Sequence, residues 1–118
     1  MSVADNKSFV RRYAEEWNTT LGDADKIRAL GESYIGAGYI HHSLIRGDMS
    51  RAQRMNYVLM LAPSMPDLIY SEEDMIAEGD KVVVRYTAHF THKGPFMGIP
   101  PSGRQIAVKG VEIYRIEG

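Results

Sequence analysis

Residues 105–116 read QIAVKGVEIYRI, a run in which two kinds of side chain alternate. In a strand, one face of this run carries mostly apolar side chains with a single carboxylate, Glu112, in their middle. The opposite face carries Gln105, Lys109 and Arg115. The more apolar face is expected to point at the core and to bring Glu112 inside. Gly110, two residues earlier, lacks a side chain and should leave room beside that carboxylate.

The segments before this strand are ordered as helices first and strands afterwards. Strand-like runs at 68–77 and 81–92 are joined by a turn at 78–81. Helical spacing predicts a first helix over 4–19, a second helix that begins after a cap at Asp23, and a third that begins after a cap at Asp48 or Ser50. A short strand is expected at 39–43. This order predicts an α+β fold whose N-terminal helices pack on a curved, mostly antiparallel sheet.

Length and composition narrow the class of protein. A chain of 118 residues is expected to form one domain, residues 1–118. It contains no cysteine, which excludes disulfides, thiolate metal sites and a cysteine nucleophile and fits a cytoplasmic location. The first seven residues do not resemble a secretory signal, and the longest apolar run, 57–62, is too short to span a bilayer, so no membrane partner is expected.

The charge pattern argues against nucleic acid as a partner. The formal net charge is −1, and the densest basic clusters are Arg11 with Arg12 and Arg51 with Arg54. Both clusters are expected on exposed helix faces, and neither forms a basic patch of the kind that nucleic-acid binders carry. Nucleotide-binding glycine loops and a GxSxG serine motif are also absent from the sequence, so neither a nucleotide cofactor nor a serine nucleophile is expected.

Two states are open to a carboxyl group in the position predicted for Glu112. Burial can raise its pKa, which suits a general acid or base near neutral pH. Alternatively, Glu112 can form a buried structural ion pair with Arg85 or with a histidine, because such networks also perturb carboxylates.

The four histidines do not form a metal-binding pattern. His41 and His42 are adjacent on a strand, so their side chains point to opposite faces, and His89 and His92 are separated in the same way. No metal site is expected. One of the first pair must face inward, where a pocket would supply a partner, and His92 is placed to reach a pocket rim at the end of its strand.

A loop of glycines and prolines at 94–103 holds large apolar side chains, including Phe96 and Met97. Such residues form either a lid over a cavity or a contact between subunits. Trp17, near the end of the first helix, is expected in the core or in the wall of a pocket.

Two motifs carry a resemblance to a known family. Residues 85–94 read RYTAHFTHKG, and residues 96–104 read FMGIPPSGR; GVEIYRIE follows at 110–117. With the helix ending in Trp17 and the segment 34–42, these runs resemble the SnoaL-like polyketide and ester cyclase family over nearly the whole chain. The resemblance implies the cone-shaped α+β barrel of the nuclear-transport-factor-2-like superfamily, with a deep pocket.

The same resemblance implies a cofactor-free enzyme that closes a ring by an aldol reaction on a small apolar or polyketide-like ligand, and a homo-oligomer, either dimer or tetramer. Glu112 lies where cyclases of the family carry an active-site histidine, and His41 lies where they carry a pocket asparagine. The acid/base aspartate of the family belongs to a further strand, reading G-K-I-x-E-x-W, so residues 1–118 are expected to lack that last strand.

Three functions follow as hypotheses. The first is a cyclase-type or isomerase-type enzyme in which Glu112 and His41 act as catalytic residues. Its ligand would contact the side chains expected around the pocket, which are Trp17, Tyr39, His92, Phe96, Met97 and Tyr114. The second is a non-catalytic binding domain on the same scaffold, and the third is a structural association domain.

Overall fold

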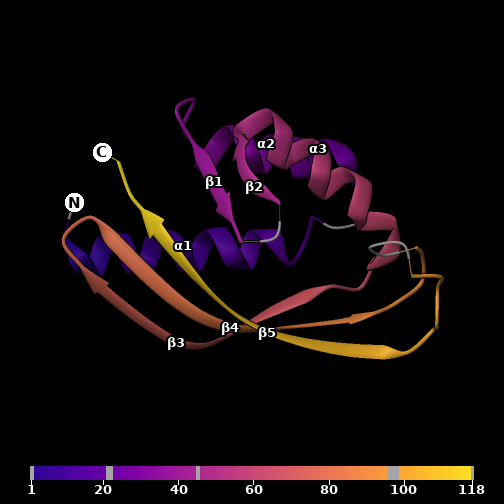
Figure 1. Cartoon of the computed structure of the whole chain (residues 1–118). Coiled ribbons are helices and arrows are strands. Elements are labelled where there is room, and N and C mark those ends of the chain that lie inside the picture. The colour runs from indigo at the N-terminus through magenta and orange to yellow at the C-terminus, as the bar shows by residue number, and fades with distance from the viewer. Residues whose placement is uncertain (1, 21–22, 45, 96–98, 118) are drawn as a thin grey trace.

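The computed structural model describes residues 2–20, 23–44, 46–95 and 99–117 (Figure 1). Within them, the helices are α1 (Val3–Trp17), α2 (Ala24–Tyr34), α3 (Arg51–Leu61) and the short 3₁₀ helix η1 (Ala62–Ser64). The strands are β1 (Ile40–Ser43), β2 (Gly47–Ser50), β3 (Ile69–Glu78), β4 (Lys81–Thr91) and β5 (Gln105–Arg115).

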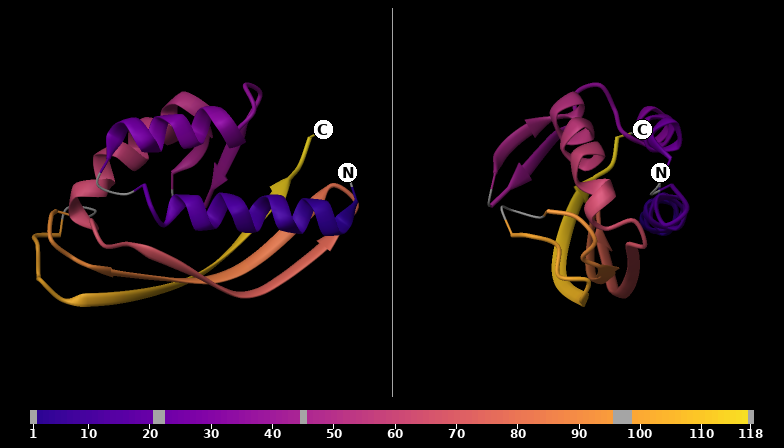
Figure 2. Two further views of the ribbon diagram at one scale, coloured as in Figure 1. Left: turned by 180° about the vertical axis from the view of Figure 1, so that it is seen from behind. Right: turned by 90° about the vertical axis from the view of Figure 1, so that its right-hand side faces the viewer.

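The strands form two antiparallel sheets. β3, β4 and β5 pair in sequence order, and β1 pairs with β2 in a separate hairpin. The three-stranded sheet curves, and the helices and the hairpin all lie on its concave side (Figures 1 and 2). The predicted α+β class is therefore confirmed. In the described part of the chain, no helix is long and apolar enough to cross a membrane.

The helix starts follow the sequence signals. The side chain of Asp23 accepts hydrogen bonds from the backbone N–H groups of residues 25 and 26 and so caps α2. Ser50 caps α3 in a reciprocal capping box with Gln53. Of the two caps considered for this helix, Ser50 is correct. Asp48 lies instead in β2, a four-residue strand that the alternation pattern did not predict, and pairs with His42.

The inward face of β5 is the one that its alternation predicts. Every even-numbered residue from Gly110 to Ile116 is half-buried, whereas every odd-numbered one is exposed. Ile106 is also half-buried, but Val108 is 45% exposed. The register places Glu112 opposite Val84 and Tyr114 opposite Val82, and both valines are buried. The carboxylate of Glu112 therefore lies on the side of the sheet that the helices cover.

The core consists of three apolar clusters joined by tyrosines. One cluster is centred on Val82 between α1 and the sheet, one on Ile27 between the helices, and one on Phe90 at the far end of the sheet. Tyr70 packs against the second and third clusters, and Tyr86 packs against the first and third. Polar hydroxyl groups therefore lie where the apolar clusters meet, and the candidate site is built at this junction.

Polar side chains fasten α1 to β3. Arg11 makes a two-pronged ion pair with Glu72, at 3.0 and 3.2 Å, across an exposed surface. The carboxamide of Asn18 binds both backbone groups of Tyr70, accepting from its N–H at 2.8 Å and donating to its carbonyl oxygen at 2.9 Å. The second contact fixes the start of β3 beside the end of α1 and so sets Tyr70 against Trp17.

Candidate functional site

A partly open cavity of about 250 Å³ lies between α3 and the inner face of the sheet. Its wall is mostly apolar, and three tyrosines, one tryptophan and one arginine add polar groups to it. The lining residues are Trp17, Arg54, Tyr57, Val58, Leu61, Ala62, Met65, Leu68, Tyr70, Tyr86, Ala88, Phe90 and Val108. An apolar hollow with a few polar groups is the usual form of a site for a small organic molecule.

Glu112 lies beside this cavity, not in its wall. The Tyr114 hydroxyl donates a short hydrogen bond to the carboxylate of Glu112. Burial raises the pKa of Glu112, while the Tyr114 hydrogen bond and the positive charge of Arg54 oppose that rise. Burial is the largest of these effects, so the carboxyl group holds its proton to a higher pH than an exposed glutamate does.

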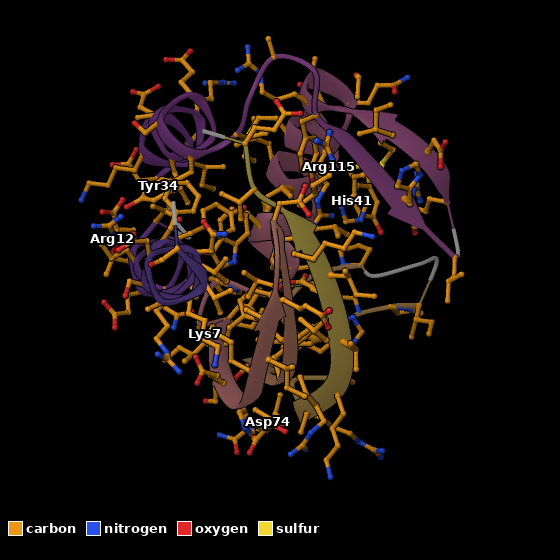
Figure 3. The ribbon with its side chains drawn as sticks, turned by 90° about the vertical axis from the view of Figure 1, so that its left-hand side faces the viewer. Lys7, Arg12, Tyr34, His41, Asp74 and Arg115 are labelled. Carbon is orange, nitrogen blue, oxygen red and sulfur yellow. The ribbon has the colours of Figure 1, made fainter. Side chains whose placement is uncertain are left out.

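The ion pair considered between Glu112 and Arg85 is absent. Arg85 is paired in register with Asp74 and Val111 on the outer face of the sheet, and it is exposed. Asp74 lies on the side of the sheet away from the helices in Figure 3. Side chains on opposite faces of a sheet cannot meet, so Arg85 on β4 does not neutralise Glu112 on β5.

Arg54 is the charged residue that faces the site, and here the sequence-based expectation was wrong. The side chain was expected on an exposed helix face, but it is half-buried and lines the cavity. The reason is helical spacing, because Arg54 precedes the buried Val58 by four residues and shares its face of α3. That spacing is the signal that could have identified Arg54.

Arg54 begins a hydrogen-bonded chain that reaches the first histidine. The guanidinium group of Arg54 binds the Tyr39 hydroxyl, which lies 3.0 Å from Nδ1 of His41. A guanidinium only donates hydrogen bonds, so the hydroxyl hydrogen of Tyr39 is free for Nδ1, and the ring proton of His41 belongs on Nε2. Burial and the nearby charge of Arg54 lower the pKa of His41, which favours the neutral ring.

Further tyrosines surround Glu112. Burial raises the pKa of Tyr13, Tyr70 and Tyr86, and a negative charge on Glu112 raises each of them further. Burial and the negative charge of Glu112 also raise the pKa of Tyr114. All four phenols therefore stay protonated and can donate hydrogen bonds. Tyr13, Tyr70 and Tyr86 were not predicted as site residues, because a tyrosine facing a core carries no distinguishing sequence pattern.

Gly110 does not leave the empty space that its missing side chain suggested. A Cβ atom at this position would lie 2.5 Å from the hydroxyl oxygen of Tyr86, the residue opposite in the β4–β5 register. The phenol of Tyr86 therefore occupies the space over Gly110. The glycine is still required at this position, because it lets a tyrosine hydroxyl lie on the strand beside Glu112.

The other residues proposed for the site fall into three groups. Trp17 lines the cavity and is also part of the core, while His41 is half-buried on the helix side of the sheet (Figure 3). His92 is 3% exposed, lies 3.2 Å from the hydroxyl of Ser102 through Nδ1, and is not among the cavity-lining residues. Phe96 and Met97 lie outside the described residues.

Within the described ranges, no three histidine, aspartate or glutamate side chains form a cluster that could hold a metal ion. Of the two neighbouring histidines, His42 is exposed and lies 2.7 Å from Asp48, while His41 binds Tyr39. The donor set of the site is therefore a carboxyl group, phenols, an imidazole and a guanidinium. These groups can transfer a proton and can stabilise a negatively charged oxygen.

The chain matches one protein family and is similar to several solved structures. The family described as SnoaL-like polyketide cyclase matches residues 7–118. No curated protein matches the chain. Among solved structures, the chain is similar to AclR, a proposed hydroxylase from Streptomyces galilaeus, with 27% identity and a TM-score of 0.83, covering 98% of this chain and 73% of that one.

Two further structures support the placement. A proposed SnoaL-like polyketide cyclase from Jannaschia sp. CCS1 is 26% identical, with a TM-score of 0.79 and coverage of 97% of this chain and 78% of that one. An NTF2-like protein of unknown function from Exiguobacterium sp. 255-15 is 14% identical, with a TM-score of 0.72 and coverage of 92% and 86%, and this likeness concerns the fold alone. Together with the match over residues 7–118, these findings show that the chain belongs to the SnoaL-like polyketide cyclase family and has an NTF2-like fold.

Proposed function

We propose that this protein is a cofactor-free enzyme of the cyclase or isomerase type that moves a proton next to a carbonyl group. The observation that supports the proposal most directly is that the carboxyl group of Glu112 points inward, where burial raises its pKa. A base that abstracts a proton from carbon works best when its pKa lies near the working pH. A buried carboxyl group meets that requirement better than an exposed one.

The proposed reaction begins with a carbonyl compound that occupies the cavity and reaches beyond its wall to the carboxylate of Glu112. The carboxylate of Glu112 takes a proton from the carbon beside the carbonyl, the electron pair of that C–H bond forms a carbon–carbon double bond, and the π electron pair of the carbonyl moves onto its oxygen. The Tyr86 hydroxyl and the Arg54 guanidinium, which both line the cavity, donate to the resulting enolate oxygen. To close a ring, the enolate carbon then attacks a second carbonyl of the same molecule, and the alkoxide that forms takes the proton back from Glu112. To isomerise the compound, the enolate instead takes that proton back from Glu112 at another carbon.

His41 has a supporting role in this proposal. Its neutral ring is held by Tyr39, and Tyr39 is held by Arg54. The imidazole therefore acts through this chain to orient the guanidinium, and its protonation would weaken the chain by placing a second positive charge beside Arg54.

A second candidate function is binding without chemistry in the same cavity. The observation that favours it is that Glu112 lies beside the cavity wall and is not one of the lining residues. Under this alternative, Glu112 is a structural carboxyl group held by Tyr114. An association domain is the third candidate, and Ile76, Val83 and Ile113, aligned across the outer face of the sheet, would form its surface. A homo-oligomer and a cytoplasmic location stay predictions from the sequence.

Exchange of carbon-bound hydrogen distinguishes the first two candidates. The protein is incubated with 2-tetralone, a bicyclic ketone, in D₂O, and loss of the signal of the hydrogens beside the carbonyl is followed by proton NMR. Under the proposal, Glu112→Gln slows the protein-dependent exchange by about 10²–10⁴-fold, the usual contribution of a positioned acid or base. Glu78→Gln, an exposed glutamate at the end of β3, is the matched control and keeps the wild-type rate. Equal rates for both variants would favour binding without chemistry.

A further inference from the structure

The cavity wall contains a hydrogen-bond donor that the protein does not use. Trp17 lines the cavity and is 8% exposed, and its indole Nε1 is buried with no hydrogen-bond partner among the described residues. A buried donor left without an acceptor is unfavourable, because it loses its hydrogen bond to water and gains nothing in return. An acceptor atom on a bound molecule would remove that cost.

Two positive charges lie beside the same cavity. The Cζ atom of Arg46 is 4.2 Å from the ring centroid of Tyr57, and that of Arg54 is 5.9 Å from it. Tyr57 and Arg54 both line the cavity. In the ranges that the structure describes, neither guanidinium is within ion-pair distance of a carboxylate. Glu112, the carboxyl group on which the charge of Arg54 acts, is buried, and burial raises its pKa. While Glu112 is protonated, the cavity has an excess of positive charge, which an anion would balance.

Trp17 and Arg54 both border Val58 in the cavity wall. Trp17 packs in the same cluster as Val58, which is one turn after Arg54 on α3. Met65, Leu68 and Phe90, which form a separate buried apolar cluster, also line the cavity. A molecule that fits this wall has one oxygen-bearing end and one apolar body.

We propose that the cavity binds an organic carboxylate, with the carboxylate accepting hydrogen bonds from Nε1 of Trp17 and from the guanidinium of Arg54 while the apolar body packs against Met65, Leu68 and Phe90. Arg46 adds a second positive charge near Tyr57 without direct contact. A neutral ketone can accept the same N–H groups, but it does not balance the charge. The site therefore selects an acid over a ketone of the same shape.

This inference rests on the proposed function only in placing the ligand in the same cavity, because it does not require Glu112 to move a proton. The two ideas can therefore fail separately. If Glu112→Gln loses exchange but the protein does not prefer the acid to the ketone, the proposed function stands and this inference fails. If the protein prefers the acid but its exchange does not depend on Glu112, this inference stands and the proposed function fails.

The test uses 2-naphthoate and 2-acetylnaphthalene, which share a ring system and differ in charge. Binding is measured by isothermal titration calorimetry with the whole chain. We expect 2-naphthoate to bind about tenfold or more tightly than the ketone, since hydrogen bonds to a charged acceptor are the stronger kind. Arg54→Gln should reduce this preference to about twofold or less, whereas Arg28→Gln, an exposed arginine of α2 that pairs with Asp25, should keep it.

A second readout needs no variant. Trp17 is the only tryptophan of the chain, so the protein gives a single indole N–H signal in a proton–nitrogen NMR spectrum. That signal should move downfield when 2-naphthoate saturates the protein, because its N–H gains a charged acceptor. Equal affinity for the two compounds, or bound 2-naphthoate that leaves the indole signal in place, would overturn the inference.

Discussion

The phenol of Tyr86 lies over Gly110 so closely that a single added carbon atom would be 2.5 Å from its hydroxyl oxygen. The two residues are opposite each other in the β4–β5 register, which brings the side chain of Tyr86 over the backbone of Gly110. Tyr86 also joins two of the three apolar clusters and lines the cavity. This contact therefore connects the packing of the sheet to the shape of the site.

Replacing this glycine should be costly. Gly110→Ala places a methyl group against the ring of Tyr86, and such overpacking lowers the free energy of unfolding by about 1–3 kcal/mol. Urea denaturation followed by circular dichroism measures the change. Gly36→Ala is the matched control, because nothing lies within 4 Å of a Cβ atom there, and its effect should stay within about 0.5 kcal/mol. Similar values for the two variants would show that Tyr86 does not pack as described.

The link between Asn18 and Tyr70 should matter for stability as well. Asn18→Ala leaves the N–H and the carbonyl oxygen of Tyr70 without their present partners, at a cost of about 1–3 kcal/mol. The emission of Trp17 should change in the folded protein, because its ring packs against Tyr70 at a centroid distance of 6.4 Å. Asn56→Ala, an exposed asparagine of α3, is the control. Unchanged stability and emission in Asn18→Ala would contradict this account of how α1 is fastened.

Stability should depend on pH through Glu112. Its pKa is raised in the folded protein, so folding favours the protonated form. The stabilisation from this proton is complete below the ordinary value of 4.5 and is lost as the pH rises through the raised pKa. Glu112→Gln resembles the protonated form at every pH, so the variant should gain stability relative to the wild type as the pH rises above 4.5. Urea denaturation of both proteins across this pH range measures the difference in stability. A relative gain of the variant that appears as the pH falls would contradict the prediction.

The groups around Glu112 should shift its pKa in known directions. In the wild type, the hydrogen bond from Tyr114 and the positive charge of Arg54 both lower the pKa of Glu112. Tyr114→Phe removes the first of these interactions, and Arg54→Gln removes the second. Each variant should therefore raise that pKa further, as measured by carbon NMR of the glutamate carboxyl groups. Arg51→Gln, on the same helix but bonded to the carbonyl oxygen of Ile35, should have little effect. A lower pKa in either test variant would contradict the described site.

Local patterns predicted most of the fold. Alternation identified β5 and its inward face, and capping residues such as Asp23 identified the helix starts. β2 escaped prediction because a four-residue strand contains too few residues to show a period. The site was harder to predict, because Arg54 resembles an ordinary surface arginine in the sequence, and its inward position follows only from the packing of α3 over the sheet. The phenol of Tyr86 over Gly110 also depends on strand register, which alternation alone does not fix.

The central claim is that Glu112 faces the inside of the protein with a raised pKa. The most direct measurement is a pH titration of the carboxyl carbon of Glu112 by NMR in the folded protein, assigned by comparison with Glu112→Gln. The structure predicts a midpoint clearly above the ordinary value of 4.5. A midpoint at or below 4.5 would mean that the carboxyl group is solvated or strongly paired, and it would contradict the proposed acid/base role.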